Sequence, residues 1–187
     1  MRKDCGSKDW VQPMPVLVLG TYDEEGKPNA MTAAWGNMCH MEPLTIQLNI
    51  TATQKTAKNL YAGSDITVHI TNKATMEAAD FVGIASGNDM DKVAKTGWTV
   101  KKSEFVKAPV FEEFPIALEC KLLSISERAT VLAEIVNVSV DEKYLDGAGQ
   151  PDISKMDIIS FNSIKQTYNV IGEEVGDAYI IGQSLLK

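Results

Sequence analysis

The stretch PVLVLGTYDEEGKPNAMTAAW, residues 15–35, decides which class of fold the chain adopts. Its first part, Pro15–Tyr22, is rich in Val and Leu, and its last part, Pro28–Trp35, again suits an extended backbone. Three acidic residues followed by Gly26 and Lys27 separate the two parts, which is typical of a turn with a glycine near its end. We therefore expect a β-hairpin.

Later segments extend this β character. Six segments that are rich in apolar residues, or that alternate them with polar ones, are predicted to be strands: Leu44–Ile50, Ile66–Thr71, Ile116–Ser126, Thr130–Val140, Ile158–Phe161 and Tyr168–Ile171. Three stretches are predicted to be helices: Gln54–Tyr61, Ala74–Ala85 and Asp89–Thr96. These helices do not alternate regularly with the strands, which argues against a doubly wound parallel sheet. We expect a mainly β fold, an antiparallel β-barrel with added helices.

Composition and charge place the chain among soluble globular proteins. Its 187 residues are 44% hydrophobic and 23% charged, a normal balance for one domain, which we expect to span residues 1–187. Lys and Arg number 18 against 25 Asp and Glu, and the resulting net charge of −7 repels nucleic acid and anionic lipid. We therefore expect no nucleic-acid partner.

No segment predicts a membrane span or an exported protein. No run approaches the roughly 20 apolar residues of a transmembrane helix. The basic N-terminal residues 1–9 lack the apolar core of a secretory signal. We expect no membrane association and a cytoplasmic location.

The cysteines and histidines do not form a reactive cluster in the sequence. Cys5, Cys39 and Cys120 are widely spaced without a C-x-x-C pair, so we expect free thiols. The two histidines, His40 and His69, lie in unrelated contexts. We therefore expect no metal site and no histidine-based catalytic triad.

The segment TATQKTAKN, residues 51–59, joins a predicted strand to a predicted helix and contains hydroxyls and lysines but no acid. Backbone N–H groups, threonine hydroxyls and Lys55 can together bind an anion at such a junction. The hydroxyls are those of Thr51, Thr53 and Thr56. The segment has the outline of a phosphate cradle; from spacing alone, threonines that cap the helix and lysines that are solvated are the expected alternative.

The second strand of the first hairpin offers a flat surface. Ala30, Thr32 and Ala34 would share one face, where their small side chains leave backbone amides accessible to a planar ring. From the residues alone, close packing of two sheets is the expected alternative. Trp35 is similarly either a core residue, which we expect from its type, or a platform for a ring.

Several segments carry, in order, the patterns of one known family. They are GKPNAMTAAWG at residues 26–36, KTAKN at 55–59, DFVGIASGND at 80–89 with Lys92, and ALECKL at 117–122 followed by EIV at 134–136. Together they resemble the flavin reductase-like, FMN-binding split-barrel family, in particular its flavoredoxin branch. The resemblance runs from about Pro15 to about Gly172.

The resemblance implies an FMN-binding split barrel of the antiparallel Greek-key type, a homodimer, and redox chemistry at a non-covalently bound FMN. The residues that it implies as FMN contacts are Asn29, Thr32, Trp35, Ala52, Lys55, Thr56, Lys92 and, beside the ring, Tyr168. Gln54 stands where relatives often have His, and Val93 stands where an aromatic residue is common. We therefore expect ring contacts and donor access to differ from those of relatives.

The implied function is an FMN-binding oxidoreductase that transfers electrons or hydride through the flavin, with no catalytic acid or base required. Two versions stay open: a reductase supplied by NADH or NADPH, and a flavoredoxin that relays electrons between proteins. The acceptor is a redox protein or a small molecule. No G-x-G-x-x-G motif is present, so a nicotinamide would lie over the flavin. The alternative class is a flavin-binding or sensing module without turnover.

Cys39 follows the strand that would support the flavin, and we expect it in the loop that leaves this strand. A thiol there could exchange electrons with the flavin, but it would need a positive environment to become a thiolate. We expect instead a small buried residue beside the cofactor.

Overall fold

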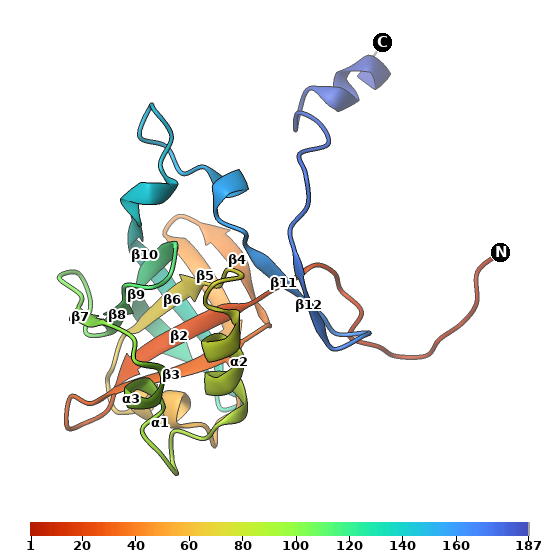
Figure 1. Ribbon diagram of the computed structural model, residues 1–187. Helices are drawn as coiled ribbons and strands as arrows, with labels where there is room; N and C mark the ends of the chain where they lie inside the picture. The colour runs from red at the N-terminus through yellow and green to blue at the C-terminus, as the bar shows by residue number, and fades with distance from the viewer. Residues whose placement is uncertain (187) are drawn as a thin grey trace.

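The computed structural model describes residues 1–186 and is built on one curved, seven-stranded sheet whose neighbouring strands are antiparallel (Figure 1). In spatial order its strands are β3 (Pro28–Ala33), β2 (Leu17–Tyr22), β6 (Ile66–Ile70), β9 (Ile116–Ile125), β10 (Thr130–Val140), β5 (Leu44–Asn49) and β4 (Gly36–Met41). The two edge strands, β3 and β4, follow each other in the chain. The predicted mainly β, antiparallel architecture with added helices is confirmed.

The remaining elements surround this sheet. Two small sheets consist of β1 (Met14–Pro15), β11 (Ile159–Asn162) and β12 (Thr167–Val170), and of β7 (Val100–Lys102) and β8 (Pro109–Phe111). The helices are α1 (Lys55–Tyr61), α2 (Met76–Ile84), α3 (Lys92–Thr96), and the 3₁₀ helices η1 (Glu142–Tyr144), η2 (Ile153–Lys155) and η3 (Ile181–Leu186). Within residues 1–186, none of the helices combines the length and the apolar content that a membrane crossing needs.

The first predicted hairpin is confirmed as β2 and β3. Leu17 lies opposite Ala33 at its open end. Gly26 has a φ of +78°, a conformation that residues with a side chain rarely adopt, so the turn needs a glycine there. The Asp23 carboxylate accepts a hydrogen bond from the Lys27 backbone at 2.9 Å and holds the turn. Sequence and local hydrogen bonding therefore specify the same hairpin.

One predicted loop contains a strand. The sequence predicts a loop after the first hairpin, whereas the structure has β4 there, paired with β5. Apart from Gly36, which is partly buried, the residues of β4 are exposed, so no apolar alternation marks the strand. Strand pairing, rather than burial of one face, therefore fixes the extended backbone of β4.

Two cores lie on opposite sides of β2. Leu17 and Leu19 belong to the core enclosed by the curved sheet. Val18 faces the other way and packs with Val82 of α2 and Phe111 of β8. A strand that is buried on both faces has no reason to alternate apolar with polar residues, which explains the continuous apolar run in β2. The second core fixes α2 and α3 against the sheet beside the edge strand β3 (Figure 1).

Candidate functional site

Three cavities lie in a row along β3. The first, of about 230 Å³, and the second, of about 360 Å³, share Gly83 and Ile84 in their walls. The second and the third, of about 440 Å³, share Ala34. Of the predicted contact residues, the first cavity has Asn29, Lys55, Thr56 and Lys92, the second has Thr32 and Tyr168, and the third has Trp35. The fold thus brings all of them except Ala52 to one continuous row.

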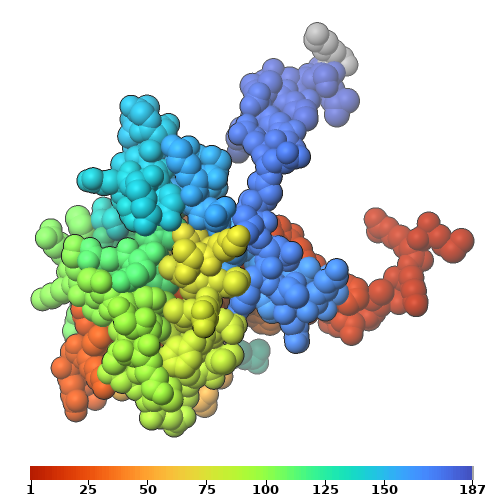
Figure 2. All heavy atoms as spheres, in the orientation of Figure 1, coloured from red at the N-terminus to blue at the C-terminus, as the bar shows by residue number. Residues whose placement is uncertain are grey.

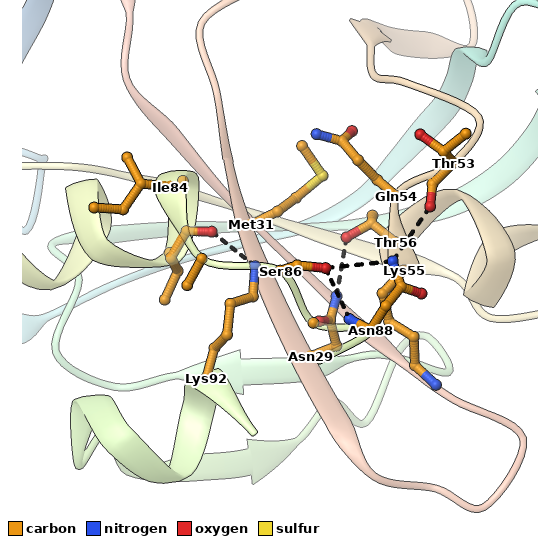
Figure 3. Close-up of a pocket in the computed structure, with 14 residues that line it drawn as sticks. Asn29, Met31, Thr53, Gln54, Lys55, Thr56, Ile84, Ser86, Asn88 and Lys92 are labelled. Carbon is orange, nitrogen blue, oxygen red and sulfur yellow. Dashed lines mark hydrogen bonds between the residues drawn. The ribbon is translucent and has the colours of Figure 1, made fainter. Parts of the chain in front are cut away.

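Polar side chains line the first cavity (Figure 3). They belong to Asn29, Thr53, Gln54, Lys55, Thr56, Ser86, Asn88 and Lys92. In the described part of the chain, no Asp or Glu lines this cavity. Hydroxyl, amide and ammonium groups without a carboxylate form an environment that favours an anionic ligand.

The start of α1 contributes Gln54 and Lys55 to this cavity. The expected alternative, a threonine cap, is wrong: Gln54 is the N-cap residue and its side chain does not cap the helix. Its Oε1 instead accepts a hydrogen bond from the Thr51 backbone at 2.8 Å. The threonines before α1 are therefore not used as helix caps.

Asn29 and Thr56 join the edge strand to α1. The Asn29 Nδ2 donates to the Thr56 Oγ1 at 2.9 Å, and both residues are buried. Since the Thr56 oxygen accepts this bond and no described residue accepts its proton, the hydroxyl retains a donor. Asn29 therefore orients Thr56, and Thr56 can donate to a ligand in the cavity.

The Lys55 ammonium lies at the rim of the cavity. Its Nζ is 3.2 Å from the Asp23 Oδ2 of the β2–β3 turn and points away from Ser86 and Asn88 (Figure 3). Desolvation alone would raise the pKa of Asp23, but hydrogen bonds from the Lys27 backbone and from Lys55 lower it below its usual range. Asp23 is therefore an anionic partner that holds this lysine in place.

The segment between α2 and α3 closes the cavity from the other side. The Asn88 Oδ1 accepts a hydrogen bond from the Lys58 Nζ at 2.7 Å, and its Nδ2 donates to the Thr53 carbonyl at 3.3 Å. Lys58 is thus bonded rather than simply solvated. These bonds connect the loop after α2 to α1 and to the segment before it.

Gly87 fits this closure because it has no side chain. A Cβ added there would lie 2.2 Å from the Asn29 Oδ1 and 3.2 Å from the Lys55 Cβ. Sequence reasoning included Ser86, Gly87 and Asn88 in a family pattern but not among the site residues, because serine and glycine are ordinary in loops. Their contacts with Asn29 and Thr53 are distant in sequence, so no local signal identifies them.

Lys92 reaches the first cavity from the start of α3. Its side chain is 5% exposed, and its Nζ donates to the Val82 carbonyl of α2 at 2.7 Å. Burial lowers the pKa of Lys92 to about 8. An ammonium has three donors, and only one acceptor for them is found among the described residues. The cavity can therefore hold an anion that completes its hydrogen bonding.

The second cavity has an aromatic wall. The Tyr168 hydroxyl on β12 donates to the Asp80 Oδ1 on α2 at 2.6 Å. Desolvation, then the hydrogen bond to Asp80 and its charge, raise the pKa of Tyr168 to about 12. The Phe161 ring of β11 lies 6.0 Å from the Tyr168 ring between centroids. This hydrogen bond ties the small sheet to α2 beside the cavity.

The face of β3 that carries Ala30 is closely packed against the helix α2, whereas the packing alternative predicts a second sheet there. Ala30 is fully buried beside Val82. The Thr32 hydroxyl donates to the Ala79 carbonyl, and a Cβ at Gly83 would lie 3.2 Å from the Thr32 Cβ. A planar ring therefore has no room over Ala30, and only the end of this face borders the second cavity.

Trp35 lies outside the strand and beside the third cavity. Its side chain is 57% exposed, so the expectation of a core residue is wrong. Its carbonyl accepts a hydrogen bond from the Asn49 backbone at 2.9 Å, which fixes the connection between β3 and β4. An exposed indole at the end of a cavity row can cover a flat ligand.

Two further expectations differ from the structure. Ala52 is exposed and lines none of the three cavities. Cys39 is exposed on β4, so the expected buried position in a loop is wrong. Its thiol lies 3.6 Å from the Thr45 carbonyl. The error at Cys39 arises because the sequence does not show that the chain continues as β4.

Comparisons with known proteins show the family and the fold of this chain. Residues 12–151 match the family described as Flavin reductase like domain. Flavoredoxin of Desulfovibrio vulgaris (Miyazaki F) is 35% identical, with 97% of this chain and 100% of that chain covered and a TM-score of 0.93. Flavoredoxin from Methanosarcina acetivorans is 25% identical, with 99% and 100% covered and a TM-score of 0.90.

A more distant likeness concerns the fold alone. An FMN-binding protein from Thermus thermophilus with bound 1-cyclohex-2-enone is 20% identical, with 95% of this chain and 99% of that chain covered and a TM-score of 0.77. These likenesses, together with the sheet, confirm the expected fold class of an antiparallel split barrel with added helices.

Proposed function

The chain belongs to the family of flavin reductase like domains, and from this premise we propose that it is an FMN-binding oxidoreductase of the flavoredoxin or flavin reductase type. The observation that carries the proposal is the row of cavities along β3, which has an anion-favouring end and an aromatic end. FMN is an elongated molecule whose two ends match this row: it has an anionic phosphate at one end and a flat aromatic ring at the other.

The phosphate end fits the first cavity. Thr56 has a free donor, Lys92 is buried with donors to spare, and Lys55 lies at the rim. Gly87 lets the loop after α2 lie close to this group. A phosphate carries the negative charge and the acceptor oxygens that such donors need. We assign these residues, with Asn29 as the group that orients Thr56, to phosphate binding.

The ring end fits the outer edge of β3. No described strand pairs with that edge, so its backbone N–H and C=O groups remain free. A flavin ring carries N–H and C=O groups that can pair with a free strand edge. We assign the ring to this edge, with Trp35 beside its far end and Tyr168 across the second cavity. No role follows for Ala52, which lines none of the cavities.

When bound, FMN supplies the redox chemistry, and the protein binds, orients and shields it. Lys92 keeps a positive charge beside an anionic group, and the Tyr168 hydroxyl is held by Asp80 instead of being free to move a proton. No side chain has to act as acid or base. The electron donor, NADH, NADPH or a redox protein, would approach from the open side of the row.

Rapid mixing of the FMN-loaded protein with NADH and with NADPH in the absence of air tests the proposal. Bleaching of the flavin absorbance by either nucleotide within seconds identifies a reductase. No bleaching by either, combined with fast reduction by a reduced redox protein, identifies an electron carrier. A protein that stays colourless with added FMN contradicts both versions, and a yellow protein that accepts electrons from none of these donors is a binding module.

A homodimer belongs to the same proposal. The exposed Trp35 and the open third cavity leave an apolar part of the row in contact with solvent in one chain. A second copy would cover it. That residues 1–187 form one domain and that the protein is cytoplasmic stay predictions.

A further inference from the structure

The last part of the chain, residues 172–186, which we call the C-terminal arm, projects away from the barrel (Figures 1 and 2). The last backbone hydrogen bond that ties the chain to the main body runs from the Ile171 amide to the Ile158 carbonyl at 2.9 Å. Beyond it, the described bonds are local to the arm, as from the Ile181 amide to the Asp177 carbonyl. The arm therefore has almost no support from its own chain.

The arm is nevertheless apolar. Its large exposed apolar side chains are Val175, Tyr179, Ile180, Ile181, Leu185 and Leu186. Tyr179, for example, is 95% exposed. Single apolar residues on a surface are ordinary, but six within such a short segment form a patch that water solvates poorly. Such a segment needs a partner surface.

A second uncovered apolar surface, which we call the hairpin patch, lies where β4, β5 and β10 meet. It consists of Met38, Met41, Leu44, Val136 and Val138. Met41 pairs with Leu44, and Glu134 pairs with Thr45, which places Leu44 beside the following residues of β10. The patch is therefore continuous across three strands, and Met41 is 90% exposed.

We propose that the C-terminal arm of one copy lies on the hairpin patch of a second copy. Each chain offers one arm and one patch, so a two-fold dimer covers both with two equal contacts. Residues 172–186 could reach up to about 50 Å if fully extended. A compact chain of 187 residues has a radius of gyration of about 16 Å, so an arm of this reach can cross to a neighbouring copy.

Charge argues against a membrane as the occupant. The ionised side chains of the described arm are all acidic: Glu173, Glu174 and Asp177. Segments that lie on membranes carry lysine and arginine that attract anionic lipid, whereas this arm and a net charge of −7 repel it. A second copy offers this arm the hairpin patch, whose five side chains are apolar and uncharged.

The contact would also act on the proposed cofactor site. The arm follows directly after β12, which carries Tyr168 of the second cavity. An arm fixed on a partner would hold β12 and its hydrogen bond to Asp80 in place. The inference thus rests on the proposed homodimer and identifies the segment that joins it.

Two full-length double variants, one with lysines on the arm and one with glutamates on the patch, test the contact by sedimentation at micromolar concentration. Ile181→Lys with Leu185→Lys alters the arm, and Met41→Glu with Val138→Glu alters the patch. Phe105→Glu is a matched control, because Phe105 is also exposed but lies between β7 and β8. We expect wild type and control to be dimers, each double variant to dimerise at least tenfold more weakly, and their mixture to regain dimers.

The mixture should recover because a lysine-bearing arm then meets a glutamate-bearing patch. An arm variant that dimerises like wild type, a monomeric wild type, or a mixture without recovery would overturn the inference. So would arm-dependent binding of wild type to anionic vesicles. FMN absorbance of the same samples separates the two proposals: a colourless, arm-dependent dimer contradicts only the flavin, and a yellow, arm-independent dimer contradicts only the arm.

Discussion

His69 and Lys92 are both buried and both able to carry a positive charge, yet their surroundings differ in one respect. The His69 Nδ1 lies 3.0 Å from the Val18 carbonyl, and its Nε2 accepts a hydrogen bond from the Phe111 amide at 3.0 Å. Both ring nitrogens are therefore satisfied by the protein. Lys92 has one acceptor, Val82, among the described residues and borders a cavity.

The difference separates a structural group from a ligand-binding group. Because the Phe111 amide donates to Nε2, the His69 ring is neutral with its proton on Nδ1. Desolvation lowers the pKa of His69 to about 4 and that of Lys92 to about 8. At neutral pH the histidine is uncharged and both of its ring nitrogens have hydrogen-bond partners. The lysine is charged, and only one of its three N–H donors has an acceptor among the described residues. An anion would complete it.

The largest expected effect is that of removing His69. His69→Ala leaves a cavity beside Phe111 and Phe114, removes the side-chain contact with the Val18 carbonyl and leaves the Phe111 amide without its acceptor. We expect the free energy of unfolding to fall by about 4 kcal/mol, measured by urea denaturation. FMN affinity of the remaining folded protein should change less than about twofold. Loss of FMN binding without loss of stability would reverse the roles assigned here.

The pH dependence of stability gives the next largest effect. The pKa of His69 is about 4 in the folded protein, against 6.5 for the free side chain, so the unfolded chain binds the extra proton between these values. Stability from this group is fully present above pH 6.5 and is lost as the pH falls towards 4, by about 3 kcal/mol. Urea denaturation of wild type and His69→Ala at several pH values isolates the contribution of His69 to the pH dependence of the free energy of unfolding. Parallel curves would contradict a neutral buried histidine.

Smaller effects are expected for Lys92, where one substitution should stabilise the apo protein but weaken FMN binding. Lys92→Met removes a buried charge, so the apo protein should be more stable by about 1 kcal/mol, while FMN should bind about 30-fold more weakly, or about 2 kcal/mol. Because folding lowers the pKa of Lys92, the stability of apo wild type relative to Lys92→Met should also rise as the pH goes from 8 towards 10.5. Unchanged FMN affinity would remove Lys92 from the site.

The parts of the fold that depend on local patterns could be predicted from the sequence. The first hairpin follows from two apolar stretches around Gly26, and the other long strands follow from their apolar content. β4 could not be predicted, because pairing with β5 fixes it and its residues are mostly exposed. The exposure of Trp35 and Cys39 escaped prediction for the same reason, since both lie at the open edge of the sheet.

The candidate site was predictable where one segment carries several of its groups. Lys55 and Thr56 stand together in a stretch without acids, which has the outline of an anion cradle and which the family resemblance places at the phosphate. Asp23, Gly87 and Asn88 were not identified, because each acts through a contact with a distant part of the chain. Contacts between segments that are distant in the chain leave no recognisable pattern in a single sequence.

The central claim, that the first cavity binds the phosphate of FMN, is tested most directly by titrating the apo protein with FMN and with riboflavin, which lacks the phosphate. We expect wild type to bind FMN much more tightly than riboflavin. Lys55→Ala should reduce this preference about tenfold, or about 1.4 kcal/mol, mainly through weaker FMN binding. Equal affinity of wild type for both ligands, or an equal loss of both in Lys55→Ala, would contradict the account.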